Sequence, residues 1–217
     1  MCENDLVTAT QAWCKRFLDI LASLTGLLLF GWLILIAALC ARISTGESGF
    51  FRQQRVGLHG KLFPILKLRT MRTGIGEQTT ATAADDPRIT RFGSILRRFK
   101  LDELPQFWNV LLGQMSLVGP RPDVPGYADR LEGEERDILN LRPGITGLAS
   151  LVFHDEEALL AASEDPERTN SEVIYPAKVA LNLRYLKDYT LKADFVYILA
   201  TFVPPLRARV APAFEAN

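Results

Sequence analysis

One uninterrupted apolar stretch constrains this chain more than any other feature. From Ile20 to Ala41 there are 22 residues without a formal charge. As an α-helix this stretch would be about 33 Å long, which matches the roughly 30 Å hydrocarbon core of a bilayer. A removable signal peptide is disfavoured, because the run is long and no small-residue cleavage site follows it. The sequence therefore predicts a membrane-embedded N-terminal anchor helix.

The residues leave open how this anchor lies in the bilayer. Arginines flank the run at both ends, so the positive-inside rule gives no orientation. In the middle, Gly31 weakens a helix and Trp32 prefers the interface to the bilayer centre. A helix that bends there and returns to the side it entered suits both residues, whereas a plain transmembrane span is the default. At the start of the run, Lys15 is one turn before Asp19 and is expected to neutralise it.

Composition excludes some classes of protein and favours others. The whole chain has a net charge of zero, but residues 1–121 carry a net charge of +6 and residues 122–217 carry −6. A basic half suits a polyanionic ligand or an anionic membrane surface. The three cysteines show neither a disulfide framework nor metal-ligand spacing, and two histidines argue against a multi-histidine metal site. Nucleic-acid binding is not expected, because basic and aromatic residues are not interleaved.

After the anchor, the pattern is that of a small, mostly helical α+β domain. Apolar and basic residues flank Leu58–Lys61, which predicts a short β-hairpin with Lys67 and Arg69 on one strand face. The other predicted elements are a frayed start over 1–10, a mobile loop over 73–86, helices over 89–101, 102–112 and 131–140, loop and short helix over 154–172, an amphipathic surface helix from Pro176, an apolar surface segment over 195–203 and an unstructured tail. We divide the chain into an anchor over 1–43, a second domain over 44–203 and a tail over 204–217.

Two adjacent carboxylates, Asp102 and Glu103, stand where a new helix is expected to begin. Apolar residues follow at spacings of three and four, and Pro105 is tolerated only in a helix's first turn. The acids are therefore predicted at or next to the helix N-cap, with Gly113 ending the helix. This stretch is either a capped helix with solvated charges or a site that holds a divalent metal and phosphates beside nearby cations. The nearby cations are Arg97, Arg98 and Lys100.

Two further arginines stand in stiff turns. Arg121 lies between two prolines, and Arg142 precedes a Pro-Gly pair. A guanidinium held in this way suits a bidentate phosphate contact. A structural proline turn with an exposed arginine explains the same residues equally well.

Taken together, these motifs resemble those of the bacterial monotopic phosphoglycosyl transferases, small sugar transferases that act on undecaprenyl phosphate. The resemblance extends from Lys15 to Gly147 and keeps the family's order of motifs. The motifs are Lys15-Arg16, Lys67-Leu68-Arg69-Thr70-Met71, Leu101-Asp102-Glu103-Leu104-Pro105-Gln106, Val118-Gly119-Pro120-Arg121-Pro122 and Arg142-Pro143-Gly144-Ile145-Thr146-Gly147. The family usually breaks its anchor helix at Ser-Pro, where this chain has Gly31-Trp32, so the resemblance supports the chemistry more firmly than a re-entrant anchor.

The resemblance implies a reaction, a cofactor and a set of site residues. A sugar 1-phosphate would move from a UDP-sugar to polyprenyl phosphate with release of UMP, at the cytoplasmic face of the bacterial inner membrane. Asp102 is implied as the nucleophile that forms a covalent phosphosugar intermediate, and Glu103 as the residue that serves the metal or a proton. Both acids would hold Mg²⁺. The cations available for the phosphates and the nucleotide are Lys67, Arg69, Arg97, Arg121 and Arg142.

Two other functions have to be weighed against this one. A non-catalytic membrane scaffold of a polysaccharide-assembly complex could recruit partners through its acidic C-terminal half, but it would not need the acid pair with its ordered basic motifs. A conventional glycosyltransferase would release UDP and would need a doubly wound nucleotide-binding domain, for which no βαβ pattern is long enough. The residues leave open which sugar is transferred, whether the product feeds exopolysaccharide or lipopolysaccharide synthesis, and whether the protein forms a homodimer.

Overall fold

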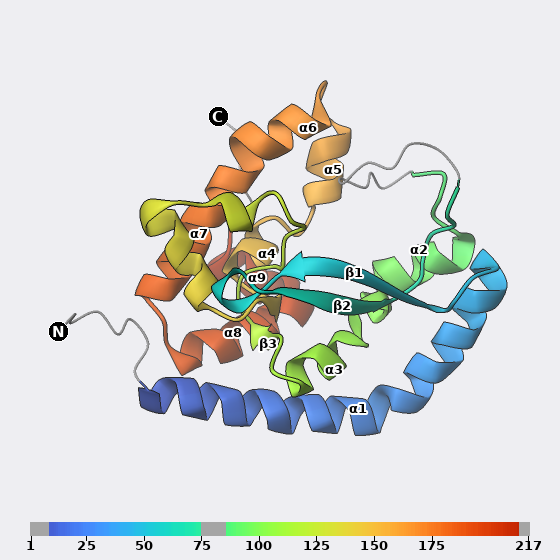
Figure 1. Cartoon of the computed structure of the whole chain (residues 1–217), viewed down its shortest axis with the longest axis horizontal. Coiled ribbons are helices and arrows are strands. Elements are labelled where there is room, and N and C mark those ends of the chain that lie inside the picture. Colours follow the sequence, from blue (N-terminus) through green and yellow to red (C-terminus); the bar gives the residue numbers. More distant parts are fainter. Residues whose placement is uncertain (1–8, 75–85, 213–217) are drawn as a thin grey trace.

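A computed structural model describes residues 9–74 and 86–212. The helices and strands are α1 (Ala9–Thr45), β1 (Phe50–Val56), β2 (Leu62–Leu68), α2 (Arg91–Arg98), α3 (Gln106–Leu111), β3 (Ser116–Val118), β4 (Gly144–Thr146), α4 (Leu148–Val152), α5 (Glu156–Ala161), α6 (Pro166–Thr169), α7 (Tyr175–Lys187), α8 (Leu191–Phe202) and α9 (Pro204–Val210). Figure 1 shows the long helix α1 bending along two sides of the other elements. The predicted class, mostly helical α+β, is confirmed.

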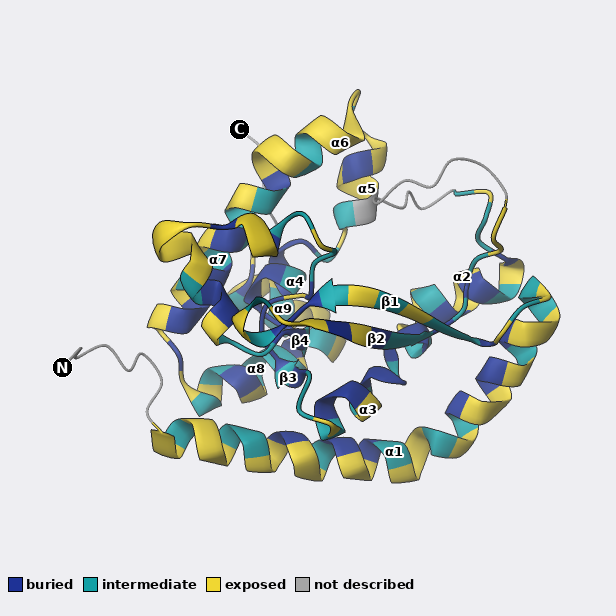
Figure 2. Cartoon of the chain, in the orientation of Figure 1, coloured by how far each residue is buried: buried dark blue, intermediate teal, exposed yellow. Residues whose placement is uncertain are grey.

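Helix α1 presents two very different faces. Its buried side is made mostly of small residues, namely Asp19, Ser23, Gly26, Ile34, Ala37, Ala38 and Ala41. A Cβ on Gly26 would lie 2.9 Å from the ring of Phe107 in α3, so only glycine allows this close approach. The outward side carries large apolar side chains such as Leu28, which is 76% exposed, and Ile43, which is 77% exposed (Figure 2). Among the described helices, α1 is the one long and apolar enough to cross a membrane by length and composition.

The bend divides α1 into a first arm and a second arm, and both arms pack against the same domain (Figure 1). In the first arm, Asp19 Oδ1 accepts hydrogen bonds from Ser116 Oγ at 3.1 Å and from the Leu117 N–H at 2.9 Å. In the second arm, a Cβ on Gly49 would lie 1.9 Å from the carbonyl oxygen of Ala38, so the chain after α1 returns directly onto the helix. The helix is therefore held to the remaining elements near both of its ends.

The ion pair expected between Lys15 and Asp19 gives way to a longer-range one. Lys15 Nζ lies 2.6 Å from Asp194 Oδ2 on α8, and Tyr185 donates a hydrogen bond of 2.6 Å to the other oxygen of Asp194. Asp19 is occupied instead by the β3 backbone. The expected pair was based on spacing within one helix. In the structure, Lys15 and Asp19 each find a partner on another element.

The predicted hairpin is confirmed. Strands β1 and β2 pair in antiparallel register, with Phe50 opposite Leu68 and Val56 opposite Leu62. Between them, His59 and Gly60 adopt left-handed conformations with φ of 56° and 74°, which closes the turn. Most of the loop expected over 73–86 lies outside the described residues, as do residues 1–8 of the start that was expected to be frayed. Residues 9 and 10 already belong to α1, so the expectation is wrong for them.

A second, parallel strand pair positions the loop that carries Arg121. Ser116 pairs with Gly144 and Val118 with Thr146. The backbones of Gly119, just after β3, and Gly144, in β4, are in close contact. A Cβ on Gly144 would lie only 2.1 Å from the nitrogen of Gly119. The main apolar core lies beside this pair, where buried side chains of β3 and of α4, α7 and α8 meet.

Four C-terminal expectations have different outcomes. The amphipathic helix from Pro176 is confirmed as α7, and short helices occupy 154–172 as expected. The solvated helix over 131–140 is instead a 3₁₀ helix over Gly133–Asn140, with Ile138 and Leu139 buried in a small cluster. The unstructured tail from residue 204 is wrong up to Val210, because Pro204 and Pro205 occupy the first turn of α9, where a missing N–H costs nothing.

Candidate active site

The acid pair lies in a tight turn between α2 and α3. Thr90 caps α2 by accepting a hydrogen bond of 2.9 Å from the Gly93 N–H. After α2, Lys100 adopts a left-handed conformation with φ of 55°, and a 3₁₀ turn over Leu101–Glu103 follows. Helix α3 begins only at Gln106 with Pro105 as its N-cap, so Asp102 and Glu103 lie three and two residues before the N-cap rather than at or next to it. Gly113, with φ of 82°, stands just past the helix end as expected.

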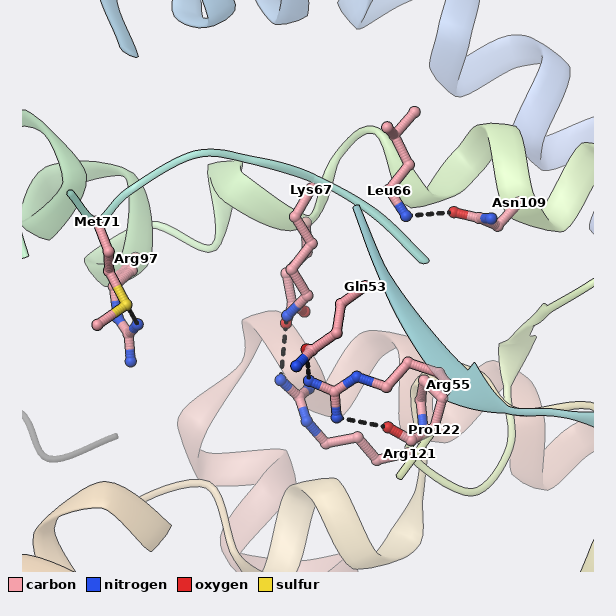
Figure 3. Close-up of polar contacts among 10 residues, drawn as sticks. Gln53, Arg55, Leu66, Lys67, Met71, Arg97, Asn109, Arg121 and Pro122 are labelled. Atoms are coloured by element: carbon pink, nitrogen blue, oxygen red, sulfur yellow. Dashed lines mark hydrogen bonds and ion pairs between the residues drawn. The ribbon is translucent and has the colours of Figure 1, made fainter. Parts of the chain in front are cut away.

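Asn109 ties α3 to the hairpin. Its Oδ1 accepts a hydrogen bond of 2.9 Å from the Leu66 N–H, and its Nδ2 donates one of 2.8 Å to the carbonyl of Pro64. Figure 3 shows Asn109 reaching Leu66 across the gap between the two elements. The turn that carries the acids is thereby held beside β2.

Glu103 is clamped between two cations. Lys67 Nζ and Arg121 Nη2 each lie 2.9 Å from the same Glu103 oxygen, Oε1. Lys67 comes from β2 and Arg121 from the loop after β3, and their side chains point toward one another (Figure 3). Burial alone would raise the pKa of the Glu103 carboxyl, but the charges of Arg121 and Lys67 outweigh it, so this pKa lies well below its ordinary value. Glu103 is therefore ionised at neutral pH.

Asp102 is in a different electrostatic state, although it is the adjacent residue. It is 9% exposed, and its Oδ1 is buried without a hydrogen-bond partner. Burial and the negative charge of Glu103 raise the pKa of the Asp102 carboxyl above its ordinary value. Three cations act in the opposite direction: Lys67, Arg97 and Lys100. A buried, unpaired carboxylate oxygen is expensive, and it is the group at this site that gains most from a ligand.

The donor set suits a magnesium ion shared with a substrate. No group of three or more His, Cys, Asp or Glu side chains that could hold a metal exists among residues 9–74 and 86–212. Mg²⁺ is commonly bound by one or two protein carboxylates together with substrate phosphates and water. Asp102 and Glu103 are the two carboxylates that could hold such an ion, and Asp102 Oδ1 is buried without a hydrogen-bond partner.

Three other predicted site residues lie in different places. Arg97 lies near the acids, since its charge lowers the pKa of Asp102. Arg69, one step past the end of β2, instead pairs with Glu47 at 3.0 Å and donates a hydrogen bond of 2.8 Å to the Ser48 carbonyl. Arg142 donates a hydrogen bond of 3.0 Å to the carbonyl of Gly113, at the far end of α3.

The end of α3 is thus held by two arginines. Arg16 donates hydrogen bonds of 2.7 Å and 2.9 Å to the carbonyls of Val110 and Leu111, and Arg142 bonds the following turn. Cationic groups at a helix C-terminus satisfy its free carbonyls and interact favourably with its dipole. Both arginines therefore position α3 from the end opposite the acids.

We expect Arg121→Ala and Arg142→Ala to separate these two roles. Removing Arg121 leaves Glu103 with one cation and should lower turnover by about 100-fold, the usual cost of a lost electrostatic group at a reacting centre. Removing Arg142 should cost about 1–2 kcal/mol of unfolding free energy through its hydrogen bond, with little change in the KM of the donor substrate. Steady-state kinetics measure the turnover and KM of both variants, and thermal unfolding measures their stability. A large increase in KM for Arg142→Ala would show that Arg142 contacts the substrate.

A second group of charged residues, Asp123, Arg55 and Lys178, lies beside Arg121 and was not predicted from the sequence. Burial raises the pKa of Asp123 to about 6, against the opposing charges of Lys178 and Arg55. Burial and the charge of Arg121 lower the pKa of Arg55 to about 10. Asp123 directly follows the Pro-Arg-Pro turn, so its position could have suggested a role. Arg55 and Lys178 carry no motif and were brought here only by folding.

An outward apolar helix and an acid pair framed by cations are together the features of a membrane-associated enzyme. The model of the family described as bacterial sugar transferase matches residues 10–207. The chain therefore belongs to the bacterial sugar transferase family, as the motifs indicated.

Curated relatives are similar over most of this chain. It is 32% identical to the exopolysaccharide production protein ExoY of Rhizobium meliloti, over 92% of this chain and 88% of the relative. It is 38% identical to the UDP-glucose:undecaprenyl-phosphate glucose-1-phosphate transferase of Caulobacter vibrioides, over 88% of this chain and 69% of the relative. It is 35% identical to the UDP-N-acetylgalactosamine-undecaprenyl-phosphate N-acetylgalactosaminephosphotransferase of Aeromonas hydrophila, over 90% of this chain but 44% of the relative.

Proposed function

We propose that this protein transfers a sugar 1-phosphate from a UDP-sugar to a polyprenyl phosphate, releasing UMP, as the first membrane step of glycoconjugate assembly. Relatives named for the same type of transfer with glucose and N-acetylgalactosamine support the substrate classes. The observation that carries the proposal is the buried, unpartnered Asp102 oxygen beside the clamped Glu103.

The reaction divides into two steps at Asp102. In the first, an Asp102 carboxylate oxygen attacks the sugar-bearing phosphorus of the diphosphate, a new O–P bond forms, and the anhydride bond to UMP breaks. In the second, an oxygen of the polyprenyl phosphate attacks the same phosphorus, and the bond to Asp102 breaks. The product is a polyprenyl diphosphate sugar and the free carboxylate. A covalent intermediate divides one difficult transfer into two easier ones.

The surrounding residues orient the diphosphate and balance its charge. Phosphoryl transfer needs mainly positioning and electrostatic stabilisation. Lys67 and Arg121 contribute positive charge beside the acids while Glu103 keeps both in place. Asp102 and Glu103 would hold Mg²⁺, which when bound supplies further positive charge to the phosphate oxygens. Arg97 adds a cation on the side of α2.

The experiment that tests the function is UMP release by the purified protein in detergent with a panel of UDP-sugars and polyprenyl phosphate. We expect UMP and no UDP, with one or a few sugars preferred. Release of UDP would indicate a conventional glycosyltransferase, and the absence of any nucleotide product across the panel would favour the scaffold.

We also propose that α1 enters and leaves the inner membrane on its cytoplasmic side. Both arms of α1 pack on one domain, and a helix that crossed the bilayer would separate them. Exposed apolar side chains on α8, including Phe195 and Phe202, provide a further surface that can rest on the membrane.

This topology predicts that both ends of α1 are inaccessible from outside the cell. In a background with Cys14 and Cys40 replaced by serine, neither Cys2 nor an introduced Thr45→Cys should react with a membrane-impermeant maleimide applied to intact spheroplasts. Both should react after permeabilisation. Labelling of only one of the two from outside would mean that the helix spans the membrane.

A further inference from the structure

The outward face of α2 is apolar immediately before the acid pair. Ile95 is 52% exposed and Phe99 is 63% exposed, and they stand one helical turn apart, whereas Leu96 on the other side is 1% exposed. Neither Ile95 nor Phe99 belongs to a hydrophobic core cluster of the described residues. Large apolar side chains in this position are available to an apolar ligand.

Two cations border this apolar face. The guanidinium of Arg98 lies 5.8 Å from the centre of the Phe99 ring, and both Arg98 and Lys100 are exposed. Neither forms a salt bridge with a described residue. Lys100 also adopts a left-handed conformation, with φ of 55°, which is uncommon for a residue other than glycine and costs free energy. The turn therefore holds a lysine in a strained conformation two residues before Asp102.

We propose that Ile95, Phe99, Arg98 and Lys100 form the docking strip for the polyprenyl phosphate acceptor. The isoprenoid chain would lie against Ile95 and Phe99. The phosphate would contact Arg98 and Lys100, which precede Asp102 by four and two residues in the sequence. An apolar chain that ends in a phosphate matches an apolar pair bordered by two cations that form no salt bridge with a described residue. The inference rests on the proposed function, because the acceptor is the substrate of the second step.

The two steps allow the strip to be tested separately from the chemistry. Exchange of labelled UMP into the UDP-sugar requires only the first step, whereas lipid product requires both. We expect the double variant Ile95→Ser/Phe99→Ser to raise the KM for polyprenyl phosphate at least about tenfold, while UMP exchange stays within about twofold of the parent protein. Ile95→Val/Phe99→Leu should restore most of the acceptor affinity, and Arg98→Glu should raise the same KM.

A matched control comes from α8. Phe202 is 79% exposed, somewhat more than Phe99, and belongs to a different element, so Phe202→Ser removes an exposed aromatic ring without touching the strip. We expect it to leave the acceptor KM unchanged. Thermal unfolding of every variant checks that the fold is intact.

Several outcomes would overturn the strip. An unchanged acceptor KM in Ile95→Ser/Phe99→Ser would do so, as would an equal loss in Phe202→Ser, which would indicate general contact with the membrane. Equal losses of UMP exchange and lipid product would mean that the residues are structural. Competition by phosphatidylglycerol vesicles as strong as that by polyprenyl phosphate would assign the strip to bulk lipid. Absence of UMP exchange in the parent protein would instead refute the proposed function itself.

Discussion

Asp102→Asn is expected to abolish transfer of the sugar 1-phosphate. The amide has nearly the same shape but lacks the negative charge and nucleophilicity of the carboxylate, so the first step fails. We expect product formation to fall by at least about 1,000-fold, as for other enzymes that lose a nucleophile. The direct measurement is mass spectrometry of protein quenched with UDP-sugar and no acceptor: the parent protein should carry one sugar phosphate on Asp102, and the variant none.

The pH dependence provides a check on the same residue. Asp102 must be ionised to attack, and its protonated fraction increases as pH falls. Because burial and Glu103 raise its pKa above the ordinary value, the loss of the first step on acidification should begin at a higher pH than for an exposed aspartate. Asp102→Glu keeps the carboxylate charge and is the matched control. Full turnover by Asp102→Asn would refute the assignment of Asp102 as the nucleophile.

Glu103→Gln is expected to have the second largest effect. Glu103 Oε1 is the shared partner of Lys67 and Arg121, so neutralising it leaves two cations facing one another in a partly buried site. We expect turnover to fall by at least about 100-fold, together with some loss of stability, because unpaired charges in such sites are costly.

The control for Glu103 is Glu103→Asp, which keeps the charge and shortens the side chain. It should recover part of the activity, and combining Glu103→Gln with Lys67→Met should restore stability without restoring turnover. If Glu103→Gln changes turnover only mildly, Glu103 is a structural partner of the two cations and not part of the chemistry.

Much of the site could be predicted from the sequence because its central residues are neighbours in the chain. Pro105 and the apolar spacing after it placed Asp102 and Glu103 close to the start of a helix, and α3 begins within three residues of Glu103. The hairpin that carries Lys67 was predicted from alternation and turn residues, which are also local properties.

The contacts that the sequence did not show join residues that are distant in the chain. Arg142, for which a phosphate role stays a prediction, donates a hydrogen bond to the carbonyl of Gly113, 29 residues away. Lys15 was expected to pair with Asp19, yet it pairs with Asp194, at a distance of 179 residues along the chain. Arg55 and Lys178 had no motif that could be recognised. Spacing along one element cannot say which other element will pack against it.

The sequence by itself determined the long apolar N-terminal helix, the hairpin and the acid pair, because each depends on residues close together in the chain. It determined the family through motifs that keep their order along the chain. Only the tertiary structure decided that both arms of α1 return to one domain and that Lys67 and Arg121 share a single oxygen of Glu103. It also decided that Asp102 is left buried with an unpaired oxygen. The physical reason is that burial and charge pairing, which set the state of each carboxylate, depend on elements that meet only when the chain folds.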